Sequence, residues 1–159
     1  MKHNRPDWHT YFMKMAYLVR ERSTCLRRKV GAVIVKNNQI MSTGYNGAPK
    51  RVPHCIQTGC LRQDSSIPSG QRHELCRGVH AEQNAIIQAA VNGLSIANGE
   101  LYCTNQPCSI CAKMLINAEI KTIIVSELYE DKLAKTLLEE ASINVFHFNM
   151  DTKKLTKIV

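Results

Sequence analysis

Residues 101–125 read LYCTNQPCSICAKMLINAEIKTIIV, and this stretch indicates the class of fold. Its two ends, residues 101–104 and 122–125, are short apolar runs typical of buried strands. Residues 108–118 between them suit a helix that begins just after Pro107, because a proline costs little where the first N–H groups of a helix have no partner. A strand, a helix and a second strand in this order predict a layered α/β fold.

The rest of the chain continues this alternation. The other expected elements are a helix over 7–21 with Asp7 as its N-cap, a hairpin of strands over 30–35 and through Ile40 and Met41 with a turn at Asn37-Asn38, helices over 79–92 and 131–141, and a strand over 144–148. We therefore predict one domain over residues 1–159, with a central mixed sheet and helices on both faces. Residues 44–78 lack a clear period, and so long a loop is usually functional.

The first of these helices is expected to turn one apolar stripe towards the core. Its members recur at helical spacing and are Trp8, Tyr11, Phe12, Met15 and Leu18 or Val19.

The composition narrows the class of protein. The 159 residues are 44% apolar and 21% charged, which excludes a collagen-like or low-complexity chain. No apolar run approaches the ~20 residues that span a bilayer, and residues 1–7 do not resemble a secretory signal. We expect no membrane partner and a reducing cytoplasm, in which the seven cysteines stay unpaired. The net charge of +8 favours an anionic partner, such as nucleic acid, a nucleotide or acidic lipid.

Two motifs at two expected helix starts suit a zinc site. Cys108 and Cys111 are three residues apart, so they share one face of a helix, and a helix N-terminus favours their thiolates. His80, at the start of another helix, can add a neutral nitrogen. Two thiolates and one imidazole make three protein ligands for zinc and leave the fourth position to water, as in catalytic zinc sites.

Glu82 follows His80 by two residues, which is about 200° around a helix, so it is not expected to be a ligand beside His80. We expect it to act on the zinc-bound water instead, as a general acid and base. The pair of motifs, His-x-Glu followed by Pro-Cys-x-x-Cys, is the signature of zinc nucleobase deaminases. In such an enzyme the zinc-bound hydroxide would attack C4 of a cytosine, and Glu82 would pass its proton to the ring nitrogen and to the leaving ammonia.

These motifs, with others, resemble those of the deoxycytidylate (dCMP) deaminases, a branch of the cytidine deaminase-like superfamily. The matching segments are Lys29–Ile34, Gly44–Gly47, Val79–Ile86 and Pro107–Lys113. The resemblance implies a three-layer α/β/α fold and hydrolytic deamination of dCMP to dUMP and ammonia. It also implies a homo-oligomer, commonly a hexamer, which dCTP activates and dTTP inhibits, with Mg²⁺ accompanying the effector.

The resemblance further implies which residues meet the nucleotide. Asn46 would hold it near the sugar, Ala81 belongs to the shared His-Ala-Glu motif, and Tyr129 would lie beside the base. The basic segment Arg27-Arg28-Lys29 leads into the first strand, where the resemblance places groups near the phosphate, Arg28 and Lys29 among them, although a solvated connection between helix and strand explains such a basic run equally well.

The other cysteines need a separate explanation. Cys103 lies in an expected strand and reads as a buried core residue. Some relatives carry a second zinc outside the active site, and by resemblance its ligands here would be Cys25, Cys55, Cys60 and Cys76, with His73 as a replacement for one of the last two. Such a closed site would be structural and would hold the 44–78 loop in place. The alternative is a set of free thiols.

Three other functions remain open at this point. A tRNA adenosine deaminase shares both zinc motifs, and a charge of +8 would suit RNA, but residues 44–47 and the cysteine-rich loop favour a nucleotide over nucleic acid. A deaminase of free cytidine has no need of a phosphate site. A non-catalytic zinc-binding accessory protein of the competence type has no use for Glu82 beside its metal.

Overall fold

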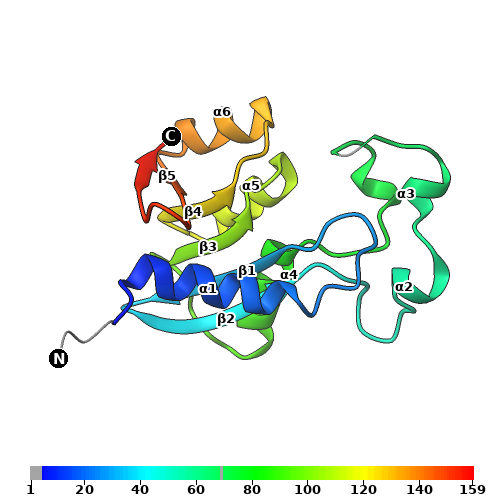
Figure 1. The fold of residues 1–159 in the computed structure, drawn as a ribbon, viewed down its shortest axis with the longest axis horizontal. Coiled ribbons are helices and arrows are strands. Elements are labelled where there is room, and N and C mark those ends of the chain that lie inside the picture. The colour runs from blue at the N-terminus through cyan, green and yellow to red at the C-terminus, as the bar shows by residue number, and fades with distance from the viewer. Residues whose placement is uncertain (1–4, 69) are drawn as a thin grey trace.

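The computed structural model describes residues 5–68 and 70–159, with a mixed six-stranded sheet of order β2-β1-β3-β4-β5-β6 at its centre (Figure 1). The strands are β1 (Gly31–Lys36), β2 (Gln39–Tyr45), β3 (Glu100–Asn105), β4 (Thr122–Glu127), β5 (Asn144–Phe148) and β6 (Leu155–Lys157). Strands β3, β4 and β5 run parallel, whereas β2, β1 and β6 pair antiparallel to their neighbours. The predicted mixed sheet is confirmed, while β6 was not anticipated because three residues carry too short a pattern.

Helices cover both faces of this sheet. Helix α1 (Trp8–Arg20) lies on one face, and α4 (Ala81–Val91), α5 (Ser109–Asn117) and α6 (Lys132–Glu140) lie on the other (Figure 1). Successive side chains of a strand point to opposite faces, so Val33 packs in the core under α1 while its neighbour Ile34 packs under the other helices. The three-layer α/β/α arrangement is confirmed.

Two glycines set how closely the helices approach the sheet. A Cβ atom at Gly31 on β1 would lie 2.1 Å from the carbonyl oxygen of Ala16 on α1. A Cβ atom at Gly44 on β2 would lie 2.2 Å from the carbonyl oxygen of Ala81, the first residue of α4. Both distances are shorter than any real contact, so α4 and the residues at its start can occupy their positions only because residue 44 is glycine.

The buried stripe of α1 differs from the predicted one. Asp7 caps the helix as expected, since its carboxylate accepts hydrogen bonds from the backbone N–H and the hydroxyl of Thr10. The apolar residues of α1 that the structure buries are Phe12, Met13 and Ala16. Those that it leaves exposed are Trp8, Tyr11 and Leu18. The close approach at Gly31 places the small Ala16 directly against the sheet, and Phe12 and Met13 are buried in the same core.

Residues 44–78 are more ordered than the expected loop. Strand β2 reaches Tyr45, and the segment then forms three short helices, α2 (Cys55–Thr58), α3 (Leu61–Asp64) and the 3₁₀ helix η1 (His73–Leu75). Figure 1 shows this excursion extending away from the sheet, beyond the start of α4. In the part of the chain that the structure describes, no helix is long and apolar enough to cross a membrane.

Candidate active site

The starts of two neighbouring helices form the centre of the candidate site. His80 is the N-cap of α4, and its backbone N–H donates to Oε1 of Gln83 at 2.8 Å, which fixes the entry of the chain into the helix. Cys108 is the N-cap of α5, and Cys111 lies in the first turn of the same helix. Helix α5 follows strand β3, and α4 follows an isolated β-bridge between Gly47 and Val79. The fold thus brings His80 close to two cysteines that are distant in sequence.

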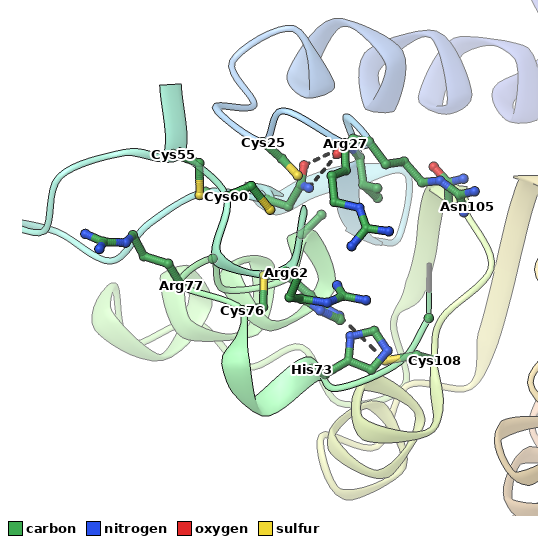
Figure 2. Close-up of a pocket in the computed structure, with 18 of the residues that line it drawn as sticks. Cys25, Arg27, Cys55, Cys60, Arg62, His73, Cys76, Arg77, Asn105 and Cys108 are labelled. Atoms are coloured by element: carbon green, nitrogen blue, oxygen red, sulfur yellow. Dashed lines mark hydrogen bonds between the residues drawn. The ribbon is translucent and has the colours of Figure 1, made fainter. Parts of the chain in front are cut away.

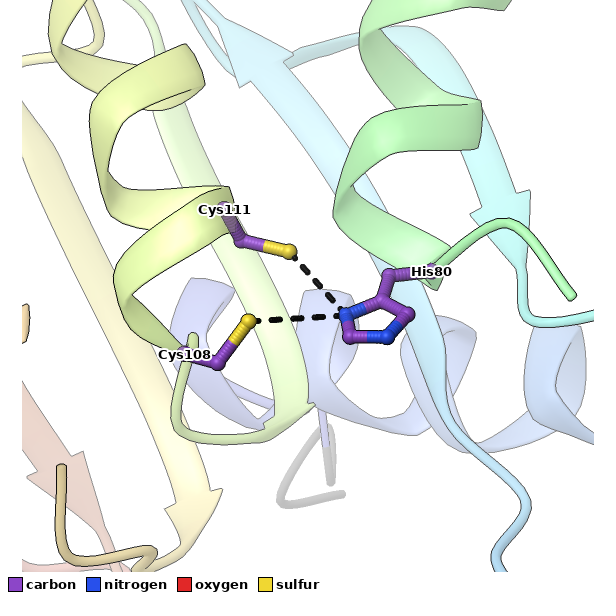
Figure 3. Close-up of side chains that lie close together, drawn as sticks. All are labelled: His80, Cys108 and Cys111. Atoms are coloured by element: carbon purple, nitrogen blue, oxygen red, sulfur yellow. Dashed lines mark hydrogen bonds between the residues drawn. The ribbon is translucent and has the colours of Figure 1, made fainter. Parts of the chain in front are cut away.

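The three side chains point at one another. Nδ1 of His80 lies 3.3 Å from Sγ of Cys111 and 3.6 Å from Sγ of Cys108 (Figure 3). In a tetrahedral zinc site with Zn–S of about 2.3 Å and Zn–N of about 2.0–2.1 Å, such N–S edges measure about 3.5 Å. The donor set and its spacing therefore fit zinc. Glu82 is not part of this group, in agreement with the expected helical geometry.

The two thiols share their protons unequally. Hydrogen bonds from Cys111 and His80 lower the pKa of the Cys108 thiol to about 3 against the effect of its burial. The same hydrogen bond between the sulfurs, together with burial, raises the pKa of Cys111. The hydrogen bond to Cys108 also raises the pKa of His80. Cys108 is therefore the thiol that ionises more readily, and zinc binds the thiolate forms of both cysteines.

Glu82 lies in the first turn of α4 and is only 4% exposed. Burial raises the pKa of its carboxyl, although His80 acts in the opposite direction. A raised pKa brings a carboxyl closer to the working pH of an enzyme, which suits a general acid and base.

A pocket opens beside these residues and contains most of the predicted substrate-binding positions. Asn46, Arg28, Ala81 and Tyr129 line it together with His80, Glu82 and Cys108. Lys29 is exposed and is not among the residues that line the pocket. Of the three cations in the basic segment 27–29, the structure thus brings Arg27 and Arg28 to the cavity and leaves Lys29 outside.

Asn46 holds the loop that leads into β1. Its Oδ1 accepts hydrogen bonds from the hydroxyl of Ser23 at 2.6 Å and from the backbone N–H of Val30 at 2.8 Å. Its Nδ2 donates to the carbonyl oxygen of Arg28 at 2.7 Å, which leaves one amide hydrogen free for a ligand. Asn46 is therefore a positioning residue for the 23–30 loop as well as a wall of the pocket.

Tyr129 lines the pocket and lies against Gly70 of the excursion. A Cβ atom at Gly70 would lie 2.1 Å from the hydroxyl oxygen of Tyr129, and Gly70 has a φ of +82°. Only glycine satisfies both conditions. Burial raises the pKa of Tyr129, so its phenol remains a neutral hydrogen-bond donor at the pocket.

The four cysteines predicted as a second zinc site gather on the far side of the same pocket. Cys25, Cys55, Cys60 and Cys76 all line it, and the charges of the other three each act on the thiol of Cys55. Figure 2 shows them apart from Cys108. Among the described residues, His80, Cys108 and Cys111 are the only set of three or more donors within 4.8 Å of one another. The four cysteines are therefore more widely spaced than this first group.

His73 lies away from these cysteines. Its ring centroid is 5.0 Å from that of His80, and Figure 2 shows it beside Cys108. Burial lowers the pKa of His73 and favours its neutral form. The structure thus places His73 next to the three zinc-type donors and not with the cysteines, of which it was expected to replace Cys60 or Cys76.

Two further residues at the site had no motif to mark them. Asp131 caps α6, and its second oxygen accepts a hydrogen bond from Ser109 at the start of α5. Arg62 lies on α3, is 8% exposed and lines the pocket. The only sequence signal for Asp131 was its position before a predicted helix, and for Arg62 there was none.

Comparison with known proteins agrees with this geometry. The family described as "Cytidine and deoxycytidylate deaminase zinc-binding region" matches residues 6–127, which contain both helix starts and every residue that lines the pocket except Tyr129. The chain belongs to this family. It is 36% identical to the deoxycytidylate deaminase of Schizosaccharomyces pombe over 89% of this chain and 44% of that protein. It is also 37% identical to ComE operon protein 2 of Bacillus subtilis, over 92% of this chain and 74% of that protein.

Among solved structures, the fold matches the dCMP deaminase of cyanophage S-TIM5 in complex with dCMP and dUMP. The TM-score is 0.74 at 33% identity, and the match covers 90% of this chain and 98% of that one. The chain spans less than half the length of the first curated relatives it matches.

Proposed function

We propose that this protein is a zinc-dependent hydrolase that converts dCMP to dUMP and ammonia. The observation that carries the proposal is the grouping of His80, Cys108 and Cys111 beside the buried carboxyl of Glu82. A pocket opens at this group, and His80, Glu82 and Cys108 line it. The dCMP deaminase named for cyanophage S-TIM5, with dCMP and dUMP in its structure, supports the choice of substrate.

In this proposal His80, Cys108 and Cys111 hold the zinc ion. The zinc supplies a Lewis acid that lowers the pKa of water to about 7. Glu82 accepts a proton as the water oxygen bonds to C4 of the base, gives it to the ring nitrogen N3, and then carries a proton to the departing amino group, which leaves as ammonia. The atoms balance as dCMP plus water giving dUMP plus ammonia.

Three groups of the pocket would orient the nucleotide. Asn46 has a free amide hydrogen beside the 23–30 loop. Ala81 is the first residue of α4, where a backbone N–H has no partner within the helix. The phenol of Tyr129 stays neutral and can donate to the base or the sugar.

We also propose that Cys25, Cys55, Cys60 and Cys76 bind a second, structural zinc. The four thiols line one side of the pocket, and the other three each act on the thiol of Cys55, so an inward movement would complete a four-thiolate site. Metal analysis of the purified protein tests this proposal. Two zinc ions per chain are expected, and one per chain in a Cys55→Ala variant. One zinc ion per wild-type chain would contradict it.

The family resemblance extends to assembly and regulation, and we propose both for this chain. Exposed apolar side chains on and after α4 suit burial between subunits of a homo-oligomer, expected to be a hexamer, and they are Ile87, Val91 and Leu94. dCTP would activate and dTTP would inhibit the enzyme, with Mg²⁺ on the effector phosphates. Seven free thiols suit the reducing cytoplasm as its location. Sedimentation velocity, and rates with each effector with and without Mg²⁺, test these points.

Ammonia release tests the function itself. The purified protein is offered dCMP, deoxycytidine, dCTP and a tRNA anticodon stem-loop in parallel. Turnover of dCMP well above the other three is expected. Turnover of the stem-loop alone would favour the tRNA deaminase, and no turnover with fully loaded zinc would favour an accessory zinc protein.

A further inference from the structure

Three buried nitrogen atoms in the pocket have no hydrogen-bond partner among the described residues. They are Nη1 of Arg27, Nε of Arg62 and Nδ1 of His73. Buried polar groups in proteins are nearly always hydrogen-bonded, either to the chain or to something bound by it. Three unpaired nitrogens in one cavity therefore indicate that a ligand supplies the missing partners.

Arg62 presents the sharpest case. The residue is 8% exposed, and the one hydrogen bond found for its guanidinium is a donation from Nη2 to the carbonyl oxygen of Pro68 at 3.3 Å. None of the ion pairs among the described residues includes Arg62 or Arg27. A guanidinium cannot lose its proton in a protein, so its charge persists, and a buried charge without a counter-ion is costly.

The charged residues that line the pocket are mostly cationic. Four guanidinium groups line it, those of Arg27, Arg28, Arg62 and Arg77, against the single carboxylate residue Glu82. Such a cavity attracts an anion, and a guanidinium fork matches the oxygens of a phosphate.

The four arginines occupy different parts of the cavity. Arg77 donates to the carbonyl oxygen of Pro53, and its charge acts on Cys55, so it belongs to the side of the four cysteines. The charge of Arg62 acts instead on His80 and Tyr129, beside the candidate zinc ligands. Figure 2 shows Arg27 and Arg62 reaching into the space between the cysteines and His73.

We propose that Arg62 and Arg27 bind the 5′-phosphate of the nucleotide, which rests on the proposed function above. The phosphate oxygens would accept from Nε of Arg62 and Nη1 of Arg27, the two donors that the chain leaves unpaired. Within the basic segment 27–29 this assignment selects Arg27, which has a buried donor, over the exposed Arg28 and Lys29, and it adds Arg62, which the sequence did not indicate.

The position of Arg62 also links the phosphate site to the cysteines. Cys60 is the N-cap of α3, two residues before Arg62, and Cys55 begins α2 just upstream. A metal ion bound by these cysteines would fix the short helix that carries Arg62, so the excursion would serve to place a phosphate-binding residue over the pocket.

Kinetics with and without the phosphate test the proposal. Arg62→Gln and Arg27→Gln are each expected to raise the KM for dCMP about 10–100-fold, as befits the loss of a hydrogen bond to a charged group. The low activity on deoxycytidine, which lacks the phosphate, should change less than about 3-fold. Arg72→Gln is the matched control, because Arg72 is an exposed arginine of the same excursion that pairs with Glu74, and it should leave both substrates unaffected. Unchanged KM values for dCMP in both variants, or equal losses on both substrates, would overturn the proposal.

Binding and stability measurements separate this proposal from the function it rests on. Titration calorimetry with dUMP and with deoxyuridine needs no turnover, so it decides the phosphate site even if wild-type protein fails to deaminate dCMP. Wild type should prefer dUMP, and Arg62→Gln should lose most of that preference. An equal preference in wild type and variant, or no binding of dUMP by wild type, would refute it. The thermal midpoint of ligand-free Arg62→Gln should equal or exceed that of wild type, since a buried unpaired charge is removed. A lowered midpoint together with an unchanged preference for dUMP would instead show a purely structural role.

Discussion

Asp131 joins the starts of two helices, because its Oδ2 accepts a hydrogen bond from the backbone N–H of Ser109 at 2.8 Å. Its Oδ1 accepts from the N–H of Ala134 at 2.9 Å and so caps α6. Ser109 follows Cys108 directly, so the carboxylate of one helix cap holds the backbone that carries a candidate zinc ligand.

Asp131→Ala should therefore weaken both stability and metal binding. Loss of the cap is expected to lower the free energy of unfolding by about 1 kcal/mol, and the freed start of α5 should lower zinc affinity. Urea unfolding and competition with a zinc chelator measure the two effects. Asp151→Ala, at an exposed turn, is the control. A stability loss with unchanged zinc affinity would show that Asp131 acts only as a cap.

Glu82→Gln should retain the metal and lose catalysis. Glutamine keeps the size of the side chain but cannot carry the proton, so the rate of dCMP deamination is expected to fall about 10²–10⁴-fold. Zinc content, measured by metal analysis, should equal that of wild type, since Glu82 is not among the grouped donors. Substantial activity in this variant would exclude Glu82 as the proton carrier.

Cys111→Ala and Cys103→Ala form a matched pair of buried cysteine variants, because both residues are 0% exposed. Cys111→Ala removes a donor that lies 3.3 Å from His80 and should lose the catalytic zinc and all activity. Cys103→Ala should keep both and cost about 1 kcal/mol of stability. Burial raises the pKa of Cys103 and leaves it an inert thiol. Loss of zinc from Cys103→Ala would contradict this division.

Gly44→Ala should displace α4. The added Cβ would meet the backbone of Ala81 at 2.2 Å and that of Ala85 at 2.4 Å, so the helix must move or the strand must bend. A cost of about 1–3 kcal/mol is expected from thermal or urea unfolding. Gly78→Ala is the control, since its nearest neighbour would lie at an ordinary 3.6 Å. Equal stability of the two variants would argue against the close approach.

Acid should remove the contribution of the two aspartate caps. The backbone hydrogen bond from Thr10 lowers the pKa of Asp7, and the bonds from Ala134 and Ser109 outweigh burial to lower that of Asp131. A carboxyl whose folded pKa is lowered stabilises the fold above the unfolded value of about 3.9, and this contribution is lost as the pH falls through the folded pKa. Urea unfolding between pH 7 and pH 2 should therefore show a shallower decline below pH 4 in Asp7→Ala and Asp131→Ala. An unchanged decline in both would contradict the shifts.

Most of the layered fold follows from local patterns in the chain. Apolar runs such as residues 122–125, the cap at Asp7 and the proline before α5 depend on near neighbours, so they marked strands and helix starts correctly. The predicted stripe of α1 was right for Phe12, and Met15 and Val19 pack partly buried against the core, but it was wrong for Trp8 and Tyr11, because the docking of the helix at Gly31 is a tertiary contact. The short helices α2, α3 and η1 were missed because a helix of three or four residues is too short to show a hydrophobic period.

At the site, the sequence by itself was enough to predict the zinc-type donors His80, Cys108 and Cys111 and the nearby carboxyl of Glu82, because residue type and spacing indicate them. Only the tertiary structure decided which other side chains share their cavity. It brought His73 beside His80, left Lys29 in solvent and buried Arg62 without a counter-ion. The physical reason is that burial and charge pairing depend on how a long excursion folds back over the sheet, and no local pattern in the excursion encodes that return.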